Sequence, residues 1–240
     1  MNIAKLKSII YNSNNIVFFG GAGVSTESNI PDFRSSTGLY KANDNFKYSP
    51  EYMLSHTFFK SHTQEFYEFY KSNMIYKGAK PNKAHLTLTE LEKRGQLKAI
   101  ITQNIDGLHQ MAGSKNVLEL HGSIHRNYCT KCNKFFDLDY VINASTIPCC
   151  NECAGLVKPD VVLYEESLDT ETMDKALSFI ENADVLIVGG TSLSVYPAAN
   201  LVEYYRGKKL VLINKSETHY DQRALLTFTD NIGEVLSQVI

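Results

Sequence analysis

Two pairs of cysteines in this 240-residue chain have the spacing of a metal site. Cys129 and Cys132 form one C-x2-C pair, and Cys150 and Cys153 form the other, with residues 133–149 between them. Four thiolates in this arrangement are a usual ligand set for tetrahedral structural zinc, and they leave no coordination position open to a substrate. The spacing predicts one structural Zn ion that supports the folding of a small ribbon-like module.

Cys149 is a fifth thiol beside the second pair. It could replace Cys150 as a ligand, but its spacing to Cys153 is poorer, so Cys150 is the expected ligand. All five cysteines lie within residues 129–153, and the first residues lack the apolar core of a signal peptide. An odd, clustered set of this kind favours a metal site over a disulfide framework and predicts a cytoplasmic protein.

A glycine-rich loop follows a short apolar segment near the N-terminus. Residues 15–19 are β-branched and aromatic and predict a buried strand, and Gly20, Gly21 and Gly23 come directly after it. Glycines let the chain turn sharply and bring backbone N–H groups close to an anion. We expect a phosphate-binding loop, although Thr26 stands where a full dinucleotide fingerprint has its third glycine, and a plain turn is the alternative.

Polar side chains follow this loop and the next expected strand. Asp32, Phe33 and Arg34 place a carboxylate, an aromatic face and a guanidinium beside the loop, and arginine suits bidentate phosphate contact. Residues 97–102 predict a second buried strand that ends in the polar run 103–106. Ligands of open α/β sheets bind at the carboxyl ends of strands, so both groups of side chains should face one crevice.

A third short strand, expected at residues 117–120, ends at His121. A lone histidine is more often a structural residue than a catalyst. At the carboxyl end of a strand, however, an imidazole that titrates near neutral pH can act as a general base. We therefore expect His121 to lie in the same crevice.

Strand-like and helix-like segments alternate along the chain. Apolar runs at 183–190 and 209–214 predict further buried strands, and the aromatic segment 50–76 has the spacing of helical core. This alternation predicts the α/β class, with a Rossmann-like doubly wound parallel sheet that carries a small zinc-ribbon module and a helical insertion. The expected divisions are a discontinuous Rossmann-like domain of residues 1–34, 81–122 and 156–240, a loop and helical insertion at 35–80, with residues 35–49 as a lid, and a zinc-binding module at 123–155.

Composition narrows the classes of partner. Apolar residues make up 43% and charged residues 21% of the chain, as in ordinary globular proteins, and the formal net charge is −2. The charge offers no basic field for nucleic acid, and no apolar run approaches the roughly 18 residues that span a bilayer. We expect a monomer with no direct nucleic-acid partner and no membrane partner.

Taken together and in order, these motifs resemble those of the sirtuins, a family of NAD-dependent protein-lysine deacylases, in its bacterial form. The matching segments are residues 20–34, 102–106, 120–122, the two cysteine pairs, 158–162, 190–193 and 213–215. The resemblance implies an enzyme that transfers the acyl group of an acetyl-lysine protein or peptide to ADP-ribose and releases nicotinamide. NAD would be the cosubstrate, bound by the Rossmann-like domain.

The resemblance also implies roles residue by residue. His121 would be the general base on a ribose hydroxyl, with Asn104 and Asp106 as further catalytic residues at the nicotinamide pocket. The implied cofactor contacts are Gly21, Ala22, Gly23, Thr26, Asp32, Phe33, Arg34, Gln103, Asn104, Ile105, Asp106, His121, Gly190, Thr191, Ser192, Asn214, Lys215 and Ile232. The peptide would lie between residues 162–166 and 194–197, where the implied contacts are Val162, Tyr164, Glu165 and Val195.

Two departures from the family pattern concern the acylated substrate. Glu165 stands where the family has glycine, so its Cβ and charge are expected to narrow the peptide groove or to favour basic substrates. Members that remove acidic acyl groups carry a Tyr-x-x-Arg pair, and the matching residues here are Tyr70 and Asn73. Without the arginine a buried carboxylate would be uncompensated, so removal of acetyl or other neutral acyl groups is expected.

Two other functions stay open on the residues alone. Mono-ADP-ribosyl transfer or NAD hydrolysis would use the same activated ribose, intercepted by a protein side chain or by water. A catalytically weak NAD-sensing module would result if Glu165 prevents peptide turnover.

Overall fold

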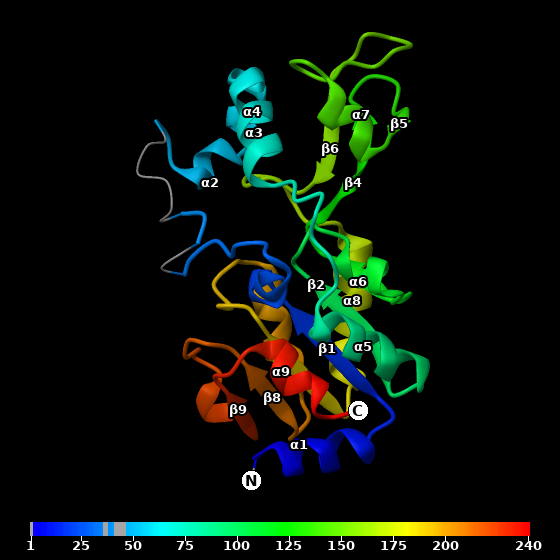
Figure 1. Ribbon diagram of the computed structural model, residues 1–240, viewed down its shortest axis with the longest axis vertical. Helices are drawn as coiled ribbons and strands as arrows, with labels where there is room; N and C mark the ends of the chain where they lie inside the picture. The colour runs from blue at the N-terminus through cyan, green and yellow to red at the C-terminus, as the bar shows by residue number, and fades with distance from the viewer. Residues whose placement is uncertain (1, 36–37, 41–46) are drawn as a thin grey trace.

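The structure, a computed structural model, describes residues 2–35, 38–40 and 47–240. In this part of the chain a six-stranded sheet forms the larger lobe, in the order β3-β2-β1-β7-β8-β9 and with parallel pairing throughout (Figure 1). Its strands are β1 (Ile16–Gly20), β2 (Leu97–Thr102), β3 (Val117–Glu119), β7 (Val185–Gly189), β8 (Leu210–Ile213) and β9 (Leu226–Phe228). The prediction of a doubly wound parallel sheet is confirmed.

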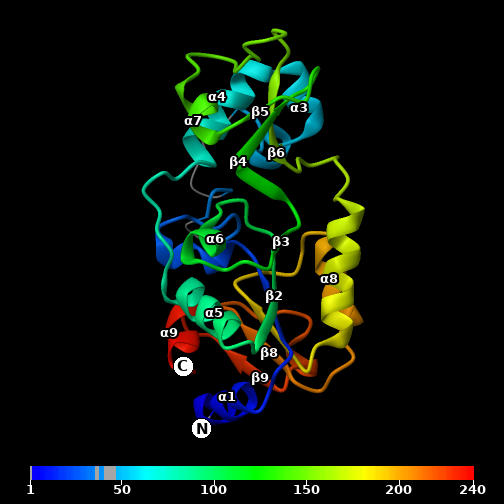
Figure 2. The same ribbon diagram turned by 90° about the vertical axis from the view of Figure 1, so that its right-hand side faces the viewer.

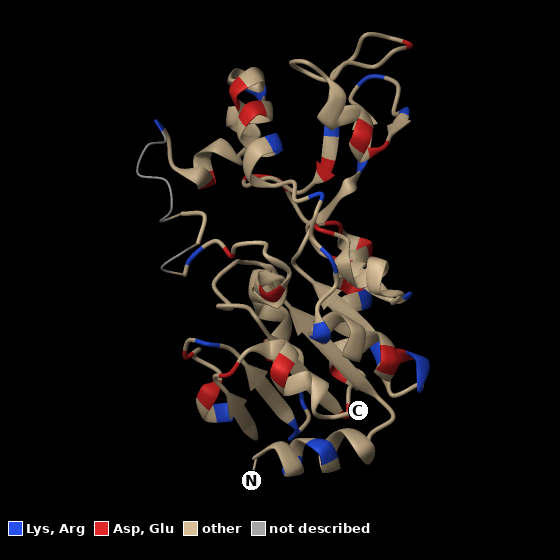
Figure 3. Cartoon of the chain, in the orientation of Figure 1, with Lys and Arg blue, Asp and Glu red and all other residues tan. Residues whose placement is uncertain are grey.

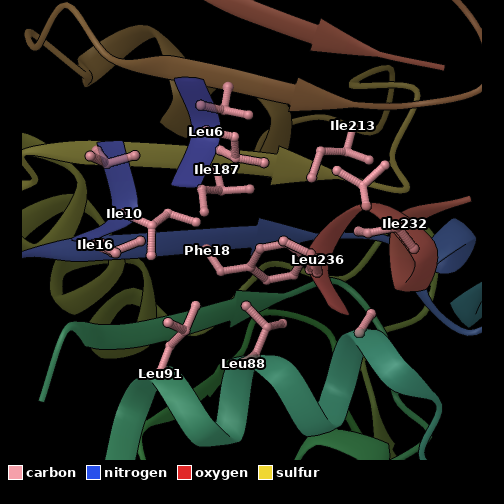
Figure 4. Packing of buried hydrophobic residues seen from close by; sticks show 14 of the residues in the cluster. Leu6, Ile10, Ile16, Phe18, Leu88, Leu91, Ile187, Ile213, Ile232 and Leu236 are labelled. Carbon is pink, nitrogen blue, oxygen red and sulfur yellow. The ribbon is translucent and has the colours of Figure 1, made fainter. Parts of the chain in front are cut away.

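Helices cover both faces of this sheet. One face packs against α1 (Asn2–Tyr11), α5 (Lys83–Lys93) and α9 (Ile232–Ser237), and the other against α8 (Thr170–Asn182) and the 3-10 helix η3 (Ala198–Tyr204). Every residue of β1 and β7 is buried, because a parallel sheet covered on both sides offers no polar face. Figure 4 shows Leu88 and Leu91 of α5 directed at the sheet, with Phe18 of β1 and Ile187 of β7 in the same cluster.

The strand order contains one reversal of direction. The chain builds outward from β1 to β2 and β3, and then returns to place β7, β8 and β9 on the other side of β1. The carboxyl ends of β1 and β7 therefore lie side by side where the winding direction changes. In open α/β sheets this position forms a crevice that binds ligands.

The smaller lobe contains an antiparallel sheet in the order β5-β4-β6. Its elements are β4 (Gly122–Cys129), β5 (Phe135–Phe136), β6 (Val157–Val161), α2 (Pro50–Met53), α3 (His56–Ser61), α4 (Thr63–Asn73) and α7 (Leu138–Asn143). Figures 1 and 2 show this lobe stacked on the larger one along the long axis of the molecule. The short elements α6 (Leu108–Ala112), η1 (Ala22–Val24), η2 (Thr26–Ser28) and η4 (Asp221–Arg223) belong to the larger lobe.

One buried cluster unites two segments that are distant in sequence. Phe58, Phe66 and Tyr70 from the helical insertion share it with Phe136 and Val157 from the cysteine-bearing segment. The aromatic spacing of residues 50–76 thus marks helical core, as predicted, because aromatic side chains bury large apolar areas.

The structure differs from the sequence predictions at several elements. Residues 50–76 form three helices where two were expected, and β4, β5, α7 and β9 were not anticipated. β6 pairs with β4, so the smaller sheet extends past the expected module boundary at residue 155. The division into domains stays a prediction, and the expected lid at 35–49 lies partly outside the described residues.

Lys and Arg residues alternate with Asp and Glu residues along the ribbon of both lobes in Figure 3. Within residues 2–35, 38–40 and 47–240, no helix is long and apolar enough to cross a membrane.

Two buried histidines join α5 to α6, the short helix that follows the polar run 103–106. The rings of His85 and His109 lie 4.7 Å apart, and both residues are almost fully buried. His85 Nδ1 accepts a hydrogen bond from the Asn82 N–H, whereas both ring nitrogens of His109 lack partners among the described residues. Burial lowers the pKa of His85 to about 4 and that of His109 to about 3, so both are neutral near pH 7.

We expect this histidine pair to make folding sensitive to acid. In the unfolded chain both imidazoles take up protons near about pH 6.5, whereas the folded state resists protonation to much lower pH. Stability should be present in full above about pH 6.5 and be lost as pH falls from there through the folded-state values. Urea unfolding gives the free energy of unfolding of the wild-type protein and of His109→Leu. Between pH 7 and pH 5 this free energy should fall less in the variant. The exposed His219 provides the control. His219→Gln should lose as much free energy of unfolding between pH 7 and pH 5 as the wild-type protein does. An equal loss in His109→Leu would contradict the expectation.

Candidate active site

A cavity of about 710 Å³ lies where the carboxyl ends of β1, β2, β7 and β8 meet. Its volume is within the usual range of small-molecule and cofactor sites. The candidate residues that line it are Gly21, Ala22, Gly23, Thr26, Asp32, Phe33, Arg34, Gln103, Asn104, Ile105, Asp106, His121, Val162, Tyr164, Glu165, Gly190, Thr191, Ser192, Val195, Asn214, Lys215 and Ile232. The structure thus brings all the candidates for cofactor and peptide binding to one cavity, while their individual roles stay predictions.

The loop after β1 packs directly on the loop after β7. A Cβ on Gly23 would lie 2.7 Å from the Gly190 Cα, so no side chain fits between them. The N–H groups of Gly21 and Gly23 donate to the carbonyls of Gly189 (3.2 Å) and Gly190 (2.8 Å). These two N–H groups were expected to face an anion, and the structure instead uses them to join the two loops.

Side-chain hydrogen bonds extend this junction across the sheet edge. Gln103 Nε2 donates to Thr191 Oγ1 (3.0 Å), and the Thr191 N–H donates to Asn214 Oδ1 (2.9 Å). Asn214 Nδ2 is buried and has no partner among the described residues, although Asn214 lines the cavity. An unpaired buried amide donor is costly, so this wall of the cavity is suited to a polar ligand that accepts a hydrogen bond.

A polar network in the cavity wall joins the loop after β1 to the run after β2. Ser25 Oγ donates to Asp106 Oδ2 (2.7 Å) and accepts from Asn104 Nδ2 (3.1 Å), while Asp106 Oδ1 accepts from the Leu108 N–H (2.9 Å). Burial raises the pKa of Asp106, and the hydrogen bonds from Leu108 and Ser25 oppose this shift. Ser25 was not among the candidate residues, although it lies within the family-like motif that could have indicated it.

His125 approaches the same network from β4. Its Nε2 lies 3.1 Å from the Asp106 carbonyl oxygen, and its ring fills the space where a side chain on Gly107 would point. His125 is exposed and lines the cavity, where it restricts the turn that carries Asp106.

His121 lies at the boundary between the two lobes. Its Nδ1 is 2.9 Å from the Gln103 carbonyl oxygen, which can only accept, so Nδ1 carries the proton and Nε2 keeps a lone pair. Burial lowers the pKa of His121, although the bond to Gln103 raises it in part. The neighbouring Gly122 has φ +74°, and a Cβ there would lie 1.9 Å from the Asp160 carbonyl oxygen. Glycine is therefore required for the chain to turn into β4 and present the imidazole to the cavity.

The segment that carries Phe33 and Arg34 folds back over the cavity. The Tyr40 N–H donates to the Phe33 carbonyl (2.9 Å), and the two rings lie 5.5 Å apart. The Arg34 guanidinium lies 5.5 Å from the centre of the Tyr40 ring. The Tyr40 and Tyr164 hydroxyls are 2.7 Å apart, so a hydrogen bond links this segment to the candidate peptide groove.

The candidate peptide groove is anchored to the helical insertion. The Tyr164 N–H donates to the Leu54 carbonyl, and the His56 N–H donates to the Tyr164 carbonyl, both at 3.0 Å. Glu165 has φ +74°, and its Oε2 accepts from the N–H (2.9 Å) and Oγ1 (2.7 Å) of Thr57. The structure pairs the carboxylate with the first turn of α3. The expectation that Glu165 narrows the groove or favours basic substrates stays a prediction.

The four candidate metal ligands come together in the smaller lobe. The Sγ atoms of Cys129, Cys132, Cys150 and Cys153 all lie within 4.8 Å of one another, while Cys149 is outside the group. The Cys129–Cys153 and Cys132–Cys150 sulfurs are 3.3 and 3.6 Å apart, too far for disulfide bonds. A tetrahedral zinc site with Zn–S bonds of about 2.3 Å needs sulfurs somewhat under about 4 Å apart, so the donor set fits such an ion.

Known proteins share both the sequence and the fold. A relative from Clostridium tetani, named an NAD-dependent protein deacetylase, is 65% identical over 236 residues, which cover 98% of this chain and 96% of the relative. A relative of the same name from Staphylococcus aureus (strain N315) is 43% identical over 239 residues, which cover 100% of this chain and 98% of the relative.

Solved structures of Sir2 proteins superimpose on the whole chain. One, described with a deacetylated p53 peptide and 3'-O-acetyl-ADP-ribose, has a TM-score of 0.90 and 38% identity and covers 100% of this chain and 97% of its own. Another, described as Sir2 with a p53 peptide and NAD+, has a TM-score of 0.86 at 38% identity, with coverage of 100% and 97%. A sequence model described as "Sir2 family" matches residues 21–197. From the family match and these whole-chain similarities it follows that the chain belongs to the Sir2 family.

Proposed function

We propose that this chain is an NAD-dependent protein-lysine deacetylase that transfers the acetyl group of a protein or peptide substrate to ADP-ribose and releases nicotinamide. The relatives of this name, which match nearly the whole chain, support the activity. The assignment of its chemistry rests on His121, whose unprotonated Nε2 belongs to a partly buried imidazole in the cavity wall between the cofactor and peptide candidates. A cytoplasmic, monomeric protein is part of the same proposal.

The cavity fits NAD through features of its own walls. The unpaired Asn214 amide and Lys215 suit the adenosine half, and Arg34 suits a phosphate. Asn104 and Asp106, fixed by Ser25, suit the carboxamide of the nicotinamide. When bound, NAD supplies the ribose carbon that loses nicotinamide and the ribose hydroxyl that finally holds the acetyl group.

His121 acts as the general base in this proposal. Its Nδ1–H is held by the Gln103 carbonyl, so the ring has one orientation and presents Nε2 as the proton acceptor. The lowered pKa keeps the ring neutral at pH 7, which a base requires. Phe33 and Tyr40 shield this part of the cavity from water, and Tyr164 with Val195 lies where the peptide is expected.

His121→Ala should lower kcat/KM by roughly 10²- to 10⁴-fold, the usual contribution of a general base. The measurement is NAD-dependent nicotinamide release with an acetyl-lysine peptide. The wild-type rate should fall on acidification as His121 takes up a proton, and the midpoint should lie below about pH 6.5 because burial lowers its pKa. The thermal unfolding temperature of His121→Ala serves as the folding control. A midpoint above pH 6.5, or a loss under tenfold, would argue against this role.

Glu165 has a positioning role in this proposal: it holds the peptide-binding segment against α3. Glu165→Gly should raise the KM for peptide by about twofold to tenfold with little change in the KM for NAD, because a segment that is not held in place must be ordered on binding. Thr57→Val removes one of the two donors and should change the peptide KM in the same direction. A lower peptide KM in Glu165→Gly would instead support the earlier expectation of a narrowed groove.

We propose zinc for the four-cysteine site, because thiolates favour soft or borderline ions in tetrahedral geometry. Metal analysis should find one zinc per chain, and chelation should lower the thermal unfolding temperature by removing the ion that holds the smaller lobe together. Cys132→Ser should lose the metal. Cys149→Ser is the matched control and should keep it, so loss of zinc in both variants would contradict the ligand assignment.

A further inference from the structure

Two stretches of chain cross between the lobes beside the proposed base. The first leaves β3 at Glu119 in the larger lobe and passes through His121 into β4. The second leaves β6 and continues into the candidate peptide segment, residues 162–166. Figure 2 shows β4 and β6 above the junction of the lobes and β3 below it. The Val162 N–H donates to the His121 carbonyl (3.0 Å), so the two stretches are bonded to each other at the base itself.

The pairing of β4 with β6 is irregular just after this crossing. Ser123 pairs with Asp160, and Asn127 pairs with the preceding residue of β6, Pro159. Residues 124–126 are therefore extra residues on β4, and we call them the β4 bulge. Bulges re-aim side chains that a regular ladder would direct to alternate faces of the sheet.

Each residue of the β4 bulge contacts the larger lobe. The Ile124 N–H donates to the Ile105 carbonyl (3.0 Å), and His125 Nε2 lies 3.1 Å from the carbonyl oxygen of the next residue in that run. Arg126 Nη1 donates to Glu119 Oε2 (2.6 Å). The bulge thus docks the smaller lobe on the run after β2 and on the end of β3.

Arg126 also bridges the two crossing stretches. While Nη1 binds the Glu119 carboxylate, its Nε donates to Asp160 Oδ2 (2.7 Å), so one guanidinium holds carboxylates from β3 and β6. Glu119 lies two residues before His121, and Asp160 lies two residues before Val162. The bridge therefore connects the strand that carries the imidazole to the strand that leads into the peptide segment.

Glu119 gives this bridge a fixed end. Its side chain is only 9% exposed, and its Oε1 accepts from Gln110 Nε2 (2.8 Å). Its backbone pairs with Thr102 of β2, so it belongs to the larger sheet. Exposed ion pairs contribute little, whereas a pair shielded from water is stronger. Arg94 and Glu90 of α5 are an example of the exposed kind, since both side chains are partly exposed and lie one helical turn apart.

We propose that Arg126 is a positioning residue for the deacetylation: it fixes the candidate peptide segment relative to His121 by bridging β6 to β3. Arginine suits this role because its planar fork can hold two carboxylates at once, which the single ammonium group of lysine does less well. Arg126 lies outside the lining of the cavity, so it acts through the backbones that it connects. This inference rests on the proposed function and adds to it a residue that need not touch NAD or peptide.

The first test is Arg126→Met, which keeps the aliphatic stem and removes the charge. The kcat/KM for an acetyl-lysine peptide should fall roughly tenfold, since a misplacement of about 1 Å can cost about 10²-fold. The Kd of NAD without peptide should stay at the wild-type value. Arg126→Lys, which can hold one carboxylate, should recover part of the loss. Thermal unfolding of each variant checks that it is folded at the assay temperature.

The second test separates positioning from a general loss of structure. Asp160→Asn breaks one end of the bridge and should also lower the kcat/KM. Combined with Arg126→Met it should cause no further loss, because both changes break the same bridge. Losses that multiply in the double variant contradict the inference.

Hydrogen exchange gives a readout that does not depend on turnover. The Val162 amide, which donates to His121, should exchange faster in Arg126→Met than in the wild type, because the crossing opens more often. Arg94→Met is the matched control, and it should keep the wild-type kcat/KM and the wild-type exchange of Val162.

A wild-type kcat/KM in Arg126→Met, or an equal loss in Arg94→Met, overturns the inference. Where the wild type deacetylates the peptide, the proposed function stands in either case. Where the wild type releases no nicotinamide with the peptide, the proposed function fails. Equal exchange of Val162 in the wild type and Arg126→Met then overturns the inference separately.

Discussion

Backbone-to-backbone packing of the loops after β1 and β7 is the contact on which the site depends. Gly190 has φ +61°, and a Cβ on it would lie 2.4 Å from the Val24 nitrogen, while a Cβ on Gly23 would strike Gly190. Only two residues without side chains can approach this closely. The reversal of strand order puts β1 beside β7. The glycines then let the two loops pack directly on each other, and the Gly23 N–H donates to the Gly190 carbonyl.

Gln103 links the packed loops to the imidazole of His121. Its N–H donates to the Gly20 carbonyl (3.0 Å), its side chain donates to Thr191 (3.0 Å), and its carbonyl accepts from His121 (2.9 Å). One residue at the end of β2 is thus bonded to the end of β1, to the loop after β7 and to His121, the proposed base. Such preorganisation matters for catalysis because a small displacement of a proton acceptor lowers the rate sharply.

The sequence was informative where the signal is local. The apolar run of Val185–Gly189 forms β7, since a strand buried on both faces needs apolar residues throughout. β9, at 226–228, is too short to carry a pattern, and β4 takes its strand form from pairing with the distant β6. The candidate site could be predicted because its residues follow strands. The direction of the Glu165 carboxylate could not, because its partner Thr57 is more than a hundred residues away.

The metal site and the apolar wall of the cavity in the smaller lobe belong to one buried cluster. Cys129 and Cys150 belong to the same buried cluster as Tyr70 and Leu163. The helical insertion and the cysteine-bearing segment are separate in sequence and too small to bury a core alone, so each completes the other. Cofactor candidates lie on the larger sheet, whereas the acyl group would contact the shared core. Changes in that core should therefore affect the acyl-binding end of the cavity sooner than its cofactor-binding end.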